Sequence, residues 1–386
     1  MAPDFSVSKP RNLDNSSALN YLISICYNKI WQSRRSVWEP WNRPPDSAVI
    51  VPGSGRKDIG KMEKRYDVVA LGELLIDMTM NGKSEQGNAL YEANPGGAPC
   101  NVLAMLKKLG HKVAFIGKVG DDIFGHELKG VLDEVGIDSD GLIIDKEART
   151  TLAFVKTFED GDRDFSFYRN PGADMLLKKD EIDADLISRA EIFHFGTLSM
   201  THKEVREATL YAVNEAKKSG ALISFDPNLR EPLWNSLDEA KEQVLNGLKY
   251  CDILKISDNE IQWLTGKDDY TEGVEWIYER FDVSLVTVSL GKNGSLAFYR
   301  KDRNSEYIKA EAAPFINRDT IETTGAGDTF GGCVLHYILV KGLDGPGESG
   351  LKEMLTFANA AASIITTRRG ALRVMPEPDE ISRLIG

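Results

Sequence analysis

Short apolar runs recur along the chain at intervals that fit buried strands. They cover residues 68–72, 113–117, 221–225, 252–256 and 285–288. Runs of this kind are typical of strands that are covered on both faces, as in parallel sheets. Between them, segments such as 123–135 and 202–218 place apolar residues at helical spacing. The alternation predicts an α/β domain with a mostly parallel central sheet that helices cover.

Two segments depart from this rhythm. Residues 77–95 show neither a helical pattern nor long buried-strand runs. Residues 150–169 alternate in polarity and contain the turn sequence Glu159-Asp-Gly-Asp, which is typical of a β-hairpin. These strands are too polar on one side for the central sheet. We therefore expect a small separate β-sheet, a lid built from about 77–98 and 150–172.

The first sixty residues do not match the rest of the chain. Residues 1–61 hold nine Lys or Arg against five Asp or Glu, and they show no alternation of strands and helices. Met62 comes just before the first strong strand pattern. We interpret 1–61 as an accessory extension without chemistry and 62–386 as the main domain. A targeting peptide, an addition made for expression and a misplaced gene start all stay open as its origin.

Composition narrows the class of partner. Among 386 residues, 47 Lys plus Arg face 59 Asp plus Glu, a net charge of −12 that disfavours binding to nucleic acid or to anionic membranes. No apolar run approaches the roughly 18–20 residues that a spanning helix needs. The four cysteines form no CxxC and the five histidines no HExxH, which disfavours a disulfide framework and a zinc site. We expect a cytoplasmic protein with small-molecule partners.

The strongest chemical signal is Glu322-Thr-Thr-Gly-Ala-Gly-Asp-Thr-Phe-Gly-Gly332, which leads into an apolar helical stretch. Small residues at Gly325, Ala326 and Gly327 let backbone N–H groups converge at a helix N-terminus, where the helix dipole favours a phosphate. Asp328 falls in the first turn, where its carboxylate could take a proton from a hydroxyl that attacks a γ-phosphate. A glycine-rich cap with a capping Asp is the plainer alternative.

This segment resembles the C-terminal signature D-T-x-G-A-G-D of the ribokinase/PfkB sugar-kinase family. Gly96-Gly-Ala-Pro-Cys-Asn101 resembles the N-terminal signature and leads into a predicted helix at 102–109. Gly117-Lys-Val-Gly-Asp-Asp-Ile-Phe-Gly125 matches the G-x-x-G-x-D-x-x-G part of that signature. Within the family, the stretch 165–174 and the opening Gly72-Glu-Leu-Leu-Ile-Asp77 look most like fructokinases. The resemblance covers roughly 66–386. It implies a ribokinase-like three-layer α/β/α domain with a β-sheet lid.

The resemblance also implies which residues hold the sugar and perform the chemistry. Asp328 would be the base, and the N–H groups of Gly325, Ala326 and Gly327 would stabilise the phosphoryl group in transfer. The implied sugar contacts are Asp77, Gly96, Gly97, Asn101 and Arg169, together with Asp328. A carboxylate such as Asp77 suits this role because it accepts hydrogen bonds from two hydroxyls. A solvated Asp77 and a surface Arg169 are the alternatives.

The nucleotide and the metal ions have implied residues as well. ATP would contact Asn228, Arg230, Thr287, Ser289, Gly291, Gly294, Gly327 and Asn359. A Pro-Asn turn, a plain hairpin at 287–294 and a helix-surface Asn359 are the alternatives. Glu260 would bind Mg²⁺ through water, in a motif whose usual Asn is Ser257 here. As an alternative, Asp258 and Asn259 fit equally well as N-cap residues of a helix. Glu322 and Thr324 would hold a monovalent cation such as K⁺, although the usual acid there is Asp.

The predicted reaction is transfer of the γ-phosphate of MgATP to a free sugar. D-Fructose, giving fructose 6-phosphate, is the leading substrate, with ribose and 2-keto-3-deoxygluconate as alternatives. A catalytically silent, kinase-like regulatory protein is the alternative from another class. A Rossmann dehydrogenase is excluded because Gly72 is followed by Glu-Leu-Leu and not by a G-x-G-x-x-G loop. We also predict a homodimer through the lid sheet, since small exposed sheets tend to pair.

Overall fold

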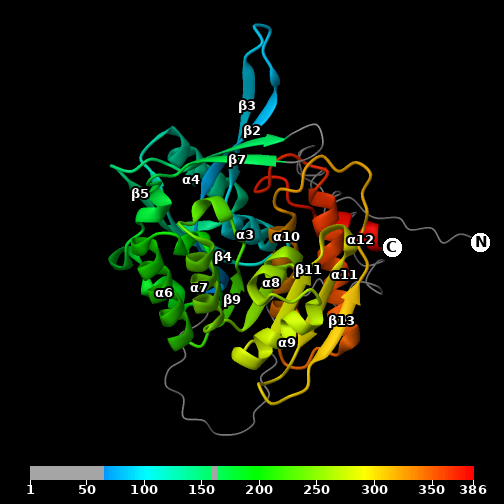
Figure 1. Ribbon diagram of the computed structural model, residues 1–386. Helices are drawn as coiled ribbons and strands as arrows, with labels where there is room; N and C mark the ends of the chain where they lie inside the picture. The colour runs from blue at the N-terminus through cyan, green and yellow to red at the C-terminus, as the bar shows by residue number, and fades with distance from the viewer. Residues whose placement is uncertain (1–64, 158–162) are drawn as a thin grey trace, which may run out of the picture. The chain divides into compact units, whose positions relative to one another are not determined.

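A large sheet is the core of the described structure (Figure 1). The computed structural model of the protein describes residues 65–157 and 163–386. Nine strands join in the order β13-β12-β11-β10-β9-β8-β1-β4-β5. They are β1 (Tyr66–Leu71), β4 (Val113–Gly120), β5 (Asp138–Asp145), β8 (Ala190–Gly196), β9 (Leu222–Asp226), β10 (Ile253–Ser257), β11 (Leu285–Ser289), β12 (Ser295–Tyr299) and β13 (Ile308–Ala312). The pairs from β11 to β5 are parallel, and β12 and β13 add antiparallel pairs at one edge. The predicted mostly parallel sheet is confirmed.

Strand burial explains why the apolar runs fold this way. β4 is buried along its whole length, and β1 is buried at all but one position, as expected for strands with helices on both faces. All five predicted strands are present, and β8 is a sixth central strand that the apolar pattern missed. Glu191 and His194 interrupt its run, although the His194 side chain is buried.

Helices cover both faces of the sheet. They are α3 (Ala98–Lys108), α4 (Ile123–Val135), α5 (Ala184–Ser188), α6 (Lys203–Lys218), α7 (Leu237–Leu248), α8 (Asp258–Thr265), α9 (Tyr270–Arg280), α10 (Ala326–Lys341), α11 (Glu348–Ile365) and α12 (Pro378–Ile385). Apolar side chains of α5 to α9 form one buried cluster with the strands. α3 packs on β1 and β4 and joins α10, which in turn packs on α11. Short 3-10 turns lie at Ala173–Leu176, Lys179–Glu181, Leu198–Met200, Glu231–Leu233 and Gly291–Asn293.

A second sheet stands apart in the order β3-β2-β6-β7 (Figure 1). Its strands are β2 (Leu75–Lys83), β3 (Ala89–Gly96), β6 (Leu152–Thr157) and β7 (Arg163–Tyr168). The small sheet and the β6–β7 hairpin are therefore as predicted. The hairpin turn lies outside the described residues, as does the predicted extension 1–61.

The base of the small sheet is tied to the large one by the Gly117–Gly125 signature. Asp122 caps α4 by accepting from the Gly125 N–H at 2.9 Å, and its carboxylate also accepts from the backbone N–H and the hydroxyl of Thr150. The Thr150 hydroxyl in turn accepts from the Gly120 N–H at 3.0 Å. This signature therefore joins the end of β4 to the chain that enters β6.

We expect Gly125→Ala to destabilise the fold by about 1–3 kcal/mol, the range for an overpacked core position. A Cβ there would lie 1.9 Å from the Gly120 carbonyl oxygen. The control is Gly130→Ala in the same helix, where nothing lies within 4 Å of the added carbon. That change should stabilise α4 by up to about 1 kcal/mol. Urea unfolding measures both, and equal effects would contradict the proposed close approach.

Candidate active site

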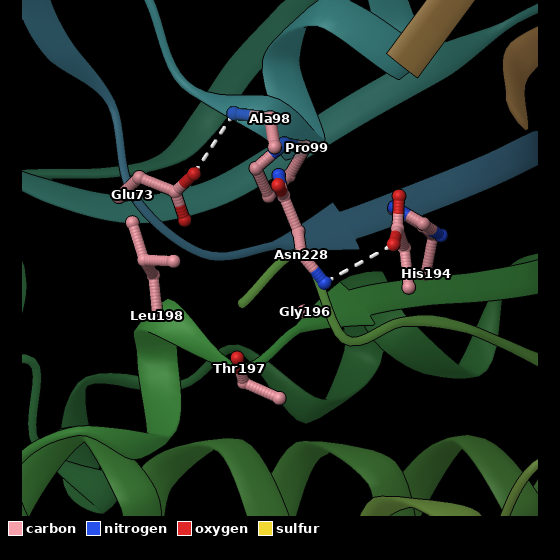
Figure 2. Close-up of a pocket in the computed structure, with 9 residues that line it drawn as sticks. Glu73, Ala98, Pro99, His194, Gly196, Thr197, Leu198 and Asn228 are labelled. Atoms are coloured by element: carbon pink, nitrogen blue, oxygen red, sulfur yellow. Dashed lines mark hydrogen bonds between the residues drawn. The ribbon is translucent and has the colours of Figure 1, made fainter. Parts of the chain in front are cut away.

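Strand ends and helix N-termini meet at one pocket beside the carboxyl edge of the large sheet (Figure 2). Its lining residues come from the ends of β1, β8 and β9 and from the start of α3: Glu73, Ala98, Pro99, His194, Gly196, Thr197, Leu198, Asp226 and Asn228. β1 lies where the chain order of the sheet reverses, between β8 and β4. Open α/β sheets bind ligands at such switch points.

The predicted base, Asp328, is hydrogen-bonded to Asn101, which is predicted to contact the sugar. Asn101 Nδ2 donates to Asp328 Oδ2 at 2.8 Å, and both side chains are buried. Asn101 Oδ1 is also buried, and no donor reaches it among the residues that the structure describes. It is therefore placed to accept from a ligand hydroxyl, because buried acceptors rarely stay unpaired. Asn101 lies in the first turn of α3, which begins at Ala98 and not at the predicted 102, since Pro99 is tolerated in a first turn.

The phosphate cradle has the predicted geometry. α10 begins at Ala326, so Asp328 lies in its first turn, and its N-cap is Gly325 in the left-handed region at φ 74°. A Cβ on Gly325 would lie 2.9 Å from Ala371 Cβ, which adds a steric reason for glycine. The Ala326 N–H donates to the Thr323 carbonyl at 3.3 Å. The N–H groups of Gly327 and Asp328 have no partner within the helix, so this end can bind an anion.

Asp77 and Asp328 belong to one electrostatic cluster. Burial raises the pKa of Asp77 to about 7, and the nearby charges of Glu322 and Asp328 add to the rise, while Arg230 opposes it. Burial also raises the pKa of Asp328, against the Asn101 hydrogen bond and the charges of Lys255 and Arg230. Arg230 and Asp328 therefore lie close enough to Asp77 to influence its pKa, while the contacts of all three with sugar and nucleotide stay predictions.

Glycines make room for these carboxylates. A Cβ on Gly96 would lie 2.5 Å from Asp77 Oδ2. Gly97 has φ 130°, and a Cβ there would lie 2.3 Å from the Glu73 carbonyl oxygen. The carboxylate of Glu73 accepts from the Ala98 N–H at 2.8 Å (Figure 2), which anchors the start of α3. The Gly96-Gly97 pair thus lets the chain pass from β3 to α3 close to Asp77 and Glu73.

A buried ion pair lies on the other side of Asp328. Lys255 Nζ is 2.9 Å from Asp226 Oδ2. Glu260 accepts from the backbone N–H groups of Leu229 and Ser257 and from the Ser257 hydroxyl. Burial alone would raise the pKa of Glu260, but the Lys255 charge and these hydrogen bonds hold it below its usual range. Burial raises the pKa of Asp226 to about 6 despite Lys255.

This arrangement corrects the capping alternative for α8. The N-cap is Ser257, which forms a capping box with Glu260, and not Asp258 or Asn259. Glu260 also ties the 226–230 loop to α8 through the Leu229 N–H. Its predicted contact with Mg²⁺ through water stays a prediction.

Three predicted site residues are buried, and for two of them the surface alternative is wrong. The Thr287 side chain is fully buried and its hydroxyl donates to the Leu254 carbonyl at 3.2 Å, while its contact with ATP stays a prediction. Asn359 is buried and not on the helix surface, and its amide donates to the carbonyls of Ala312 and Ala313. Arg169 is also buried and not a surface arginine. Its guanidinium pairs with Asp174 at 2.6 Å.

The partners of Arg169 indicate what it does in this conformation. Its guanidinium also donates to the Thr201 hydroxyl and to the Leu198 carbonyl. Asp174 accepts from Thr151 as well, so this network joins the chain on both sides of the β6–β7 hairpin to the end of β8. A direct sugar contact of Arg169 stays a prediction.

The remaining nucleotide residues lie in loops at the same edge. Asn228 follows β9 with φ 43°, and its backbone N–H donates to Asp226 at 3.1 Å (Figure 2). Ser289, Gly291 and Gly294 lie at the β11–β12 turn, so the hairpin alternative is correct for this segment. Their contacts with ATP stay predictions.

The residues predicted to bind metal ions are not grouped into one cluster of side-chain donors in the described part of the chain. Within the described residues no three His, Cys, Asp or Glu side chains are grouped to hold a metal ion. Glu322 Oε1 accepts from the Gly370 N–H at 2.8 Å, and the N–H groups of Ile321 and Glu322 donate to the Thr366 carbonyl. The segment before the cradle thus lies against 366–370. The monovalent cation site at Glu322 and Thr324 stays a prediction.

Sequence reasoning did not single out Glu73, Asp226 or Lys255. Each had a signal, since all three are charged residues within or directly after a strongly apolar strand run. A charged side chain in such a run is seldom buried without a partner. Glu73 and Asp226 also lie at carboxyl strand ends, where ligands bind, which could have marked them as site residues.

Comparison with known proteins agrees with this geometry. The family model described as pfkB family carbohydrate kinase matches residues 65–378. The chain belongs to this family. As a carbohydrate kinase it is a phosphotransferase, and the resemblance stated from its motifs is confirmed.

One relative and two solved structures that resemble the chain are named as fructokinases. The chain is 43% identical over 314 residues to probable fructokinase-2 of Arabidopsis thaliana, covering 80% of this chain and 92% of the relative. The structure of fructokinase with bound ATP from Xylella fastidiosa has TM-score 0.73 and 29% identity, covering 83% of this chain and 98% of that one. A double mutant of the Vibrio cholerae O395 fructokinase, with fructose, ADP and potassium ion bound, has TM-score 0.72 and 28% identity, covering 84% and 100%. The ribokinase-like fold of this carbohydrate kinase is therefore confirmed.

Burial raises the pKa of Glu73 to about 7, partly offset by the Glu73 and Ala98 N–H groups. Because the folded-state pKa lies above its unfolded value, this group favours folding at low pH, and that stability is lost as pH rises through about 7. We expect Glu73→Gln to raise the melting temperature at pH 8 by a few degrees and to leave it nearly unchanged at pH 4.5. Thermal unfolding at both pH values measures this, and a pH-independent difference would contradict a buried ionising Glu73.

Proposed function

We propose that this carbohydrate kinase is an ATP-dependent fructokinase that converts D-fructose to fructose 6-phosphate. The observation that carries the proposal is the buried Asp328 in the first turn of α10, held by Asn101 and in one electrostatic cluster with Asp77 and Arg230. The fructokinase names of its relatives support the choice of sugar. Ribose and 2-keto-3-deoxygluconate are the competing substrates.

The residues suit direct transfer of a phosphoryl group. The Asp77 carboxylate and the unpaired Asn101 Oδ1 accept hydrogen bonds from sugar hydroxyls. Asp328 takes the proton of the attacking hydroxyl as its oxygen bonds to the γ-phosphorus. The bond from that phosphorus to the β–γ bridging oxygen breaks, and its electron pair leaves with ADP. The N–H groups at the start of α10 stabilise the transferring charge, so positioning and electrostatics do most of the work.

We propose Mg²⁺ and K⁺ as the ions that accompany ATP. The absence of a three-residue metal cluster in the described chain fits a divalent ion that nucleotide phosphates and water hold, near Glu260. When bound, Mg²⁺ neutralises phosphate charge. Glu322, Thr324 and the 366–370 backbone would hold K⁺ beside the cradle. Neighbouring structures with potassium or calcium ions support ion binding near this fold's substrates.

We further propose a cytoplasmic enzyme that pairs through its lid. In the described part of the chain no helix is both long and apolar enough to cross a membrane. On the lid face opposite Asp77, the Phe154 ring contacts those of Tyr91 and Tyr168, both of which are exposed. An apolar sheet face of this kind is suited to a second copy. The predicted roles of 1–61 as an accessory extension and of the small sheet as a closing lid remain proposals.

An ADP-release assay tests the proposed function. Purified protein would be given MgATP with fructose, ribose, 2-keto-3-deoxygluconate, glucose or adenosine, each with and without potassium. We expect strong turnover with fructose. Preference for another sugar would keep the mechanism and replace the substrate. No turnover by folded, ATP-binding protein would favour a catalytically silent homologue.

Asp328→Asn should lower kcat by at least about a hundredfold, the lower range for loss of a general base. The Asn side chain can still accept from Asn101 Nδ2, so folding and ATP binding should remain. The control is Asp379→Asn, an exposed Asp in the first turn of α12. Steady-state kinetics should leave the control unchanged. Retained kcat in Asp328→Asn would refute the base assignment.

The kcat/KM for fructose should fall about tenfold per pH unit below about pH 7, where Asp77 gains a proton and loses acceptor capacity. Asp77→Asn should remove this limb, lower kcat/KM for fructose by about 10–100-fold, and change the KM for ATP much less. A pH series for wild type and variant measures both effects. Equal changes in the two KM values would place Asp77 away from the sugar.

A further inference from the structure

Lys255 is a cation inside a core strand, close to the phosphate cradle. Its side chain is 11% exposed and lies in β10, with Nζ 2.9 Å from Asp226 Oδ2. A Cβ on Gly327 would lie 3.0 Å from the same nitrogen. The ammonium group therefore lies against the second residue of α10, the helix that begins with the cradle.

A cation in this place is electrostatically unusual. The start of a helix carries a partial positive charge, so an ammonium group there is disfavoured unless an anion comes between them. Asp226 offsets part of that cost from one side. Glu260 and Asp328 lie close enough to favour the charged lysine, but the Glu260 oxygens already accept from Ser257 and Leu229.

A second buried lysine shows what a purely structural ion pair looks like in this fold. Lys118, on β4, donates to Asp145, to Glu181 and to the Leu176 carbonyl. These three acceptors match the three N–H donors of an ammonium group. For Lys255, the one ion-pair partner within the described residues is Asp226. Lys255 thus retains donor capacity on the side of Gly327.

We propose that Lys255 donates hydrogen bonds to the phosphoryl group in transfer and is a catalytic residue, with Asp226 as its positioning residue. The proposal rests on the proposed kinase function and deepens it. As the sugar oxygen bonds to the γ-phosphorus and the bridging oxygen leaves with ADP, Lys255 contacts a non-bridging oxygen and stays protonated. The hydroxyl proton goes to Asp328, so Lys255 exchanges no proton.

The same charge has a second effect on the base. Burial raises the pKa of Asp328, and the charges of Lys255 and Arg230 limit the rise. The other titratable groups near Lys255 are Asp226, Glu260 and His194. Burial and Lys255 lower the pKa of His194 to about 3, so this histidine stays neutral. Loss of the lysine charge therefore moves the acid limb of the kcat profile to higher pH.

The test compares Lys255→Met with Lys118→Met, which removes the other buried lysine. We expect Lys255→Met to lower kcat with fructose by about 10²–10³-fold, as for loss of a donor to a transition-state oxyanion, with the KM for fructose within about threefold. Its acid limb should move to higher pH. Lys118→Met should lower the melting temperature and keep kcat within about twofold. Adding propylammonium to Lys255→Ala should restore part of kcat.

Three results separate the alternatives. Folded Lys255→Met with near wild-type kcat and an unmoved pH profile would overturn the proposal. If that variant does not fold, Lys255→Arg decides, because it keeps a charge for Asp226 but has little space beside Gly327. A tenfold or greater loss of kcat supports the proposal, and wild-type kcat overturns it. Absence of sugar turnover in the wild-type protein would instead remove the proposed function, on which this inference rests.

Discussion

The hydrogen bond from Asn101 to Asp328 is the contact on which the site depends. It joins the first turn of α3 to the first turn of α10, and its two residues are 227 positions apart in the chain. Because both helices start at the carboxyl edge of the same sheet, the polar side chains in their first turns face one region. The bond sets the carboxylate of Asp328 while leaving Asn101 Oδ1 unpaired. The proposed base and the proposed sugar acceptor are therefore positioned by one interaction.

Burying several acids at one edge has an energetic cost, which the fold offsets locally. Burial raises the pKa values of Asp77, Asp226 and Asp328, because a buried carboxylate loses the hydration that stabilises its charge in water. Lys255 and Arg230 supply the opposing charge. Carboxylates with raised pKa values accept protons more readily near neutral pH, which suits a base for a sugar hydroxyl. The burial that lowers the free energy of unfolding thus also raises the pKa values that suit the proposed chemistry.

Much of this architecture follows from local pattern. The five apolar strand runs, the helical stretches and the hairpin at 150–169 are visible because burial imposes simple periodicities. β8 was missed because Glu191 and His194 break its run, and only the surrounding tertiary structure buries His194. The cradle at 325–328 was predictable since its geometry is local to a helix start. Their charge in apolar runs could have marked Lys255 and Asp226, but their pairing was not predictable, because it comes from strands that are adjacent only in the folded sheet.

Side-chain direction was the other limit. The Thr287 side chain is buried beside β10, where its hydroxyl donates to the Leu254 carbonyl, a contact that its predicted place at the nucleotide did not indicate. Asn359 and Arg169 likewise point into packed regions, where backbone carbonyls accept from them. Sequence spacing alone does not show which face of a helix or strand the rest of the folded chain will cover.

The central claim is that a sugar hydroxyl lies between Asp328 and a phosphoryl group bound at the start of α10. A crystal structure of the wild-type protein with fructose, ADP, magnesium and aluminium fluoride measures this directly. We predict one fructose hydroxyl within hydrogen-bond distance of Asp328 and the fluoride group against the N–H groups of Ala326 and Gly327. A sugar bound with no hydroxyl near Asp328, or a fluoride group away from α10, would contradict the account.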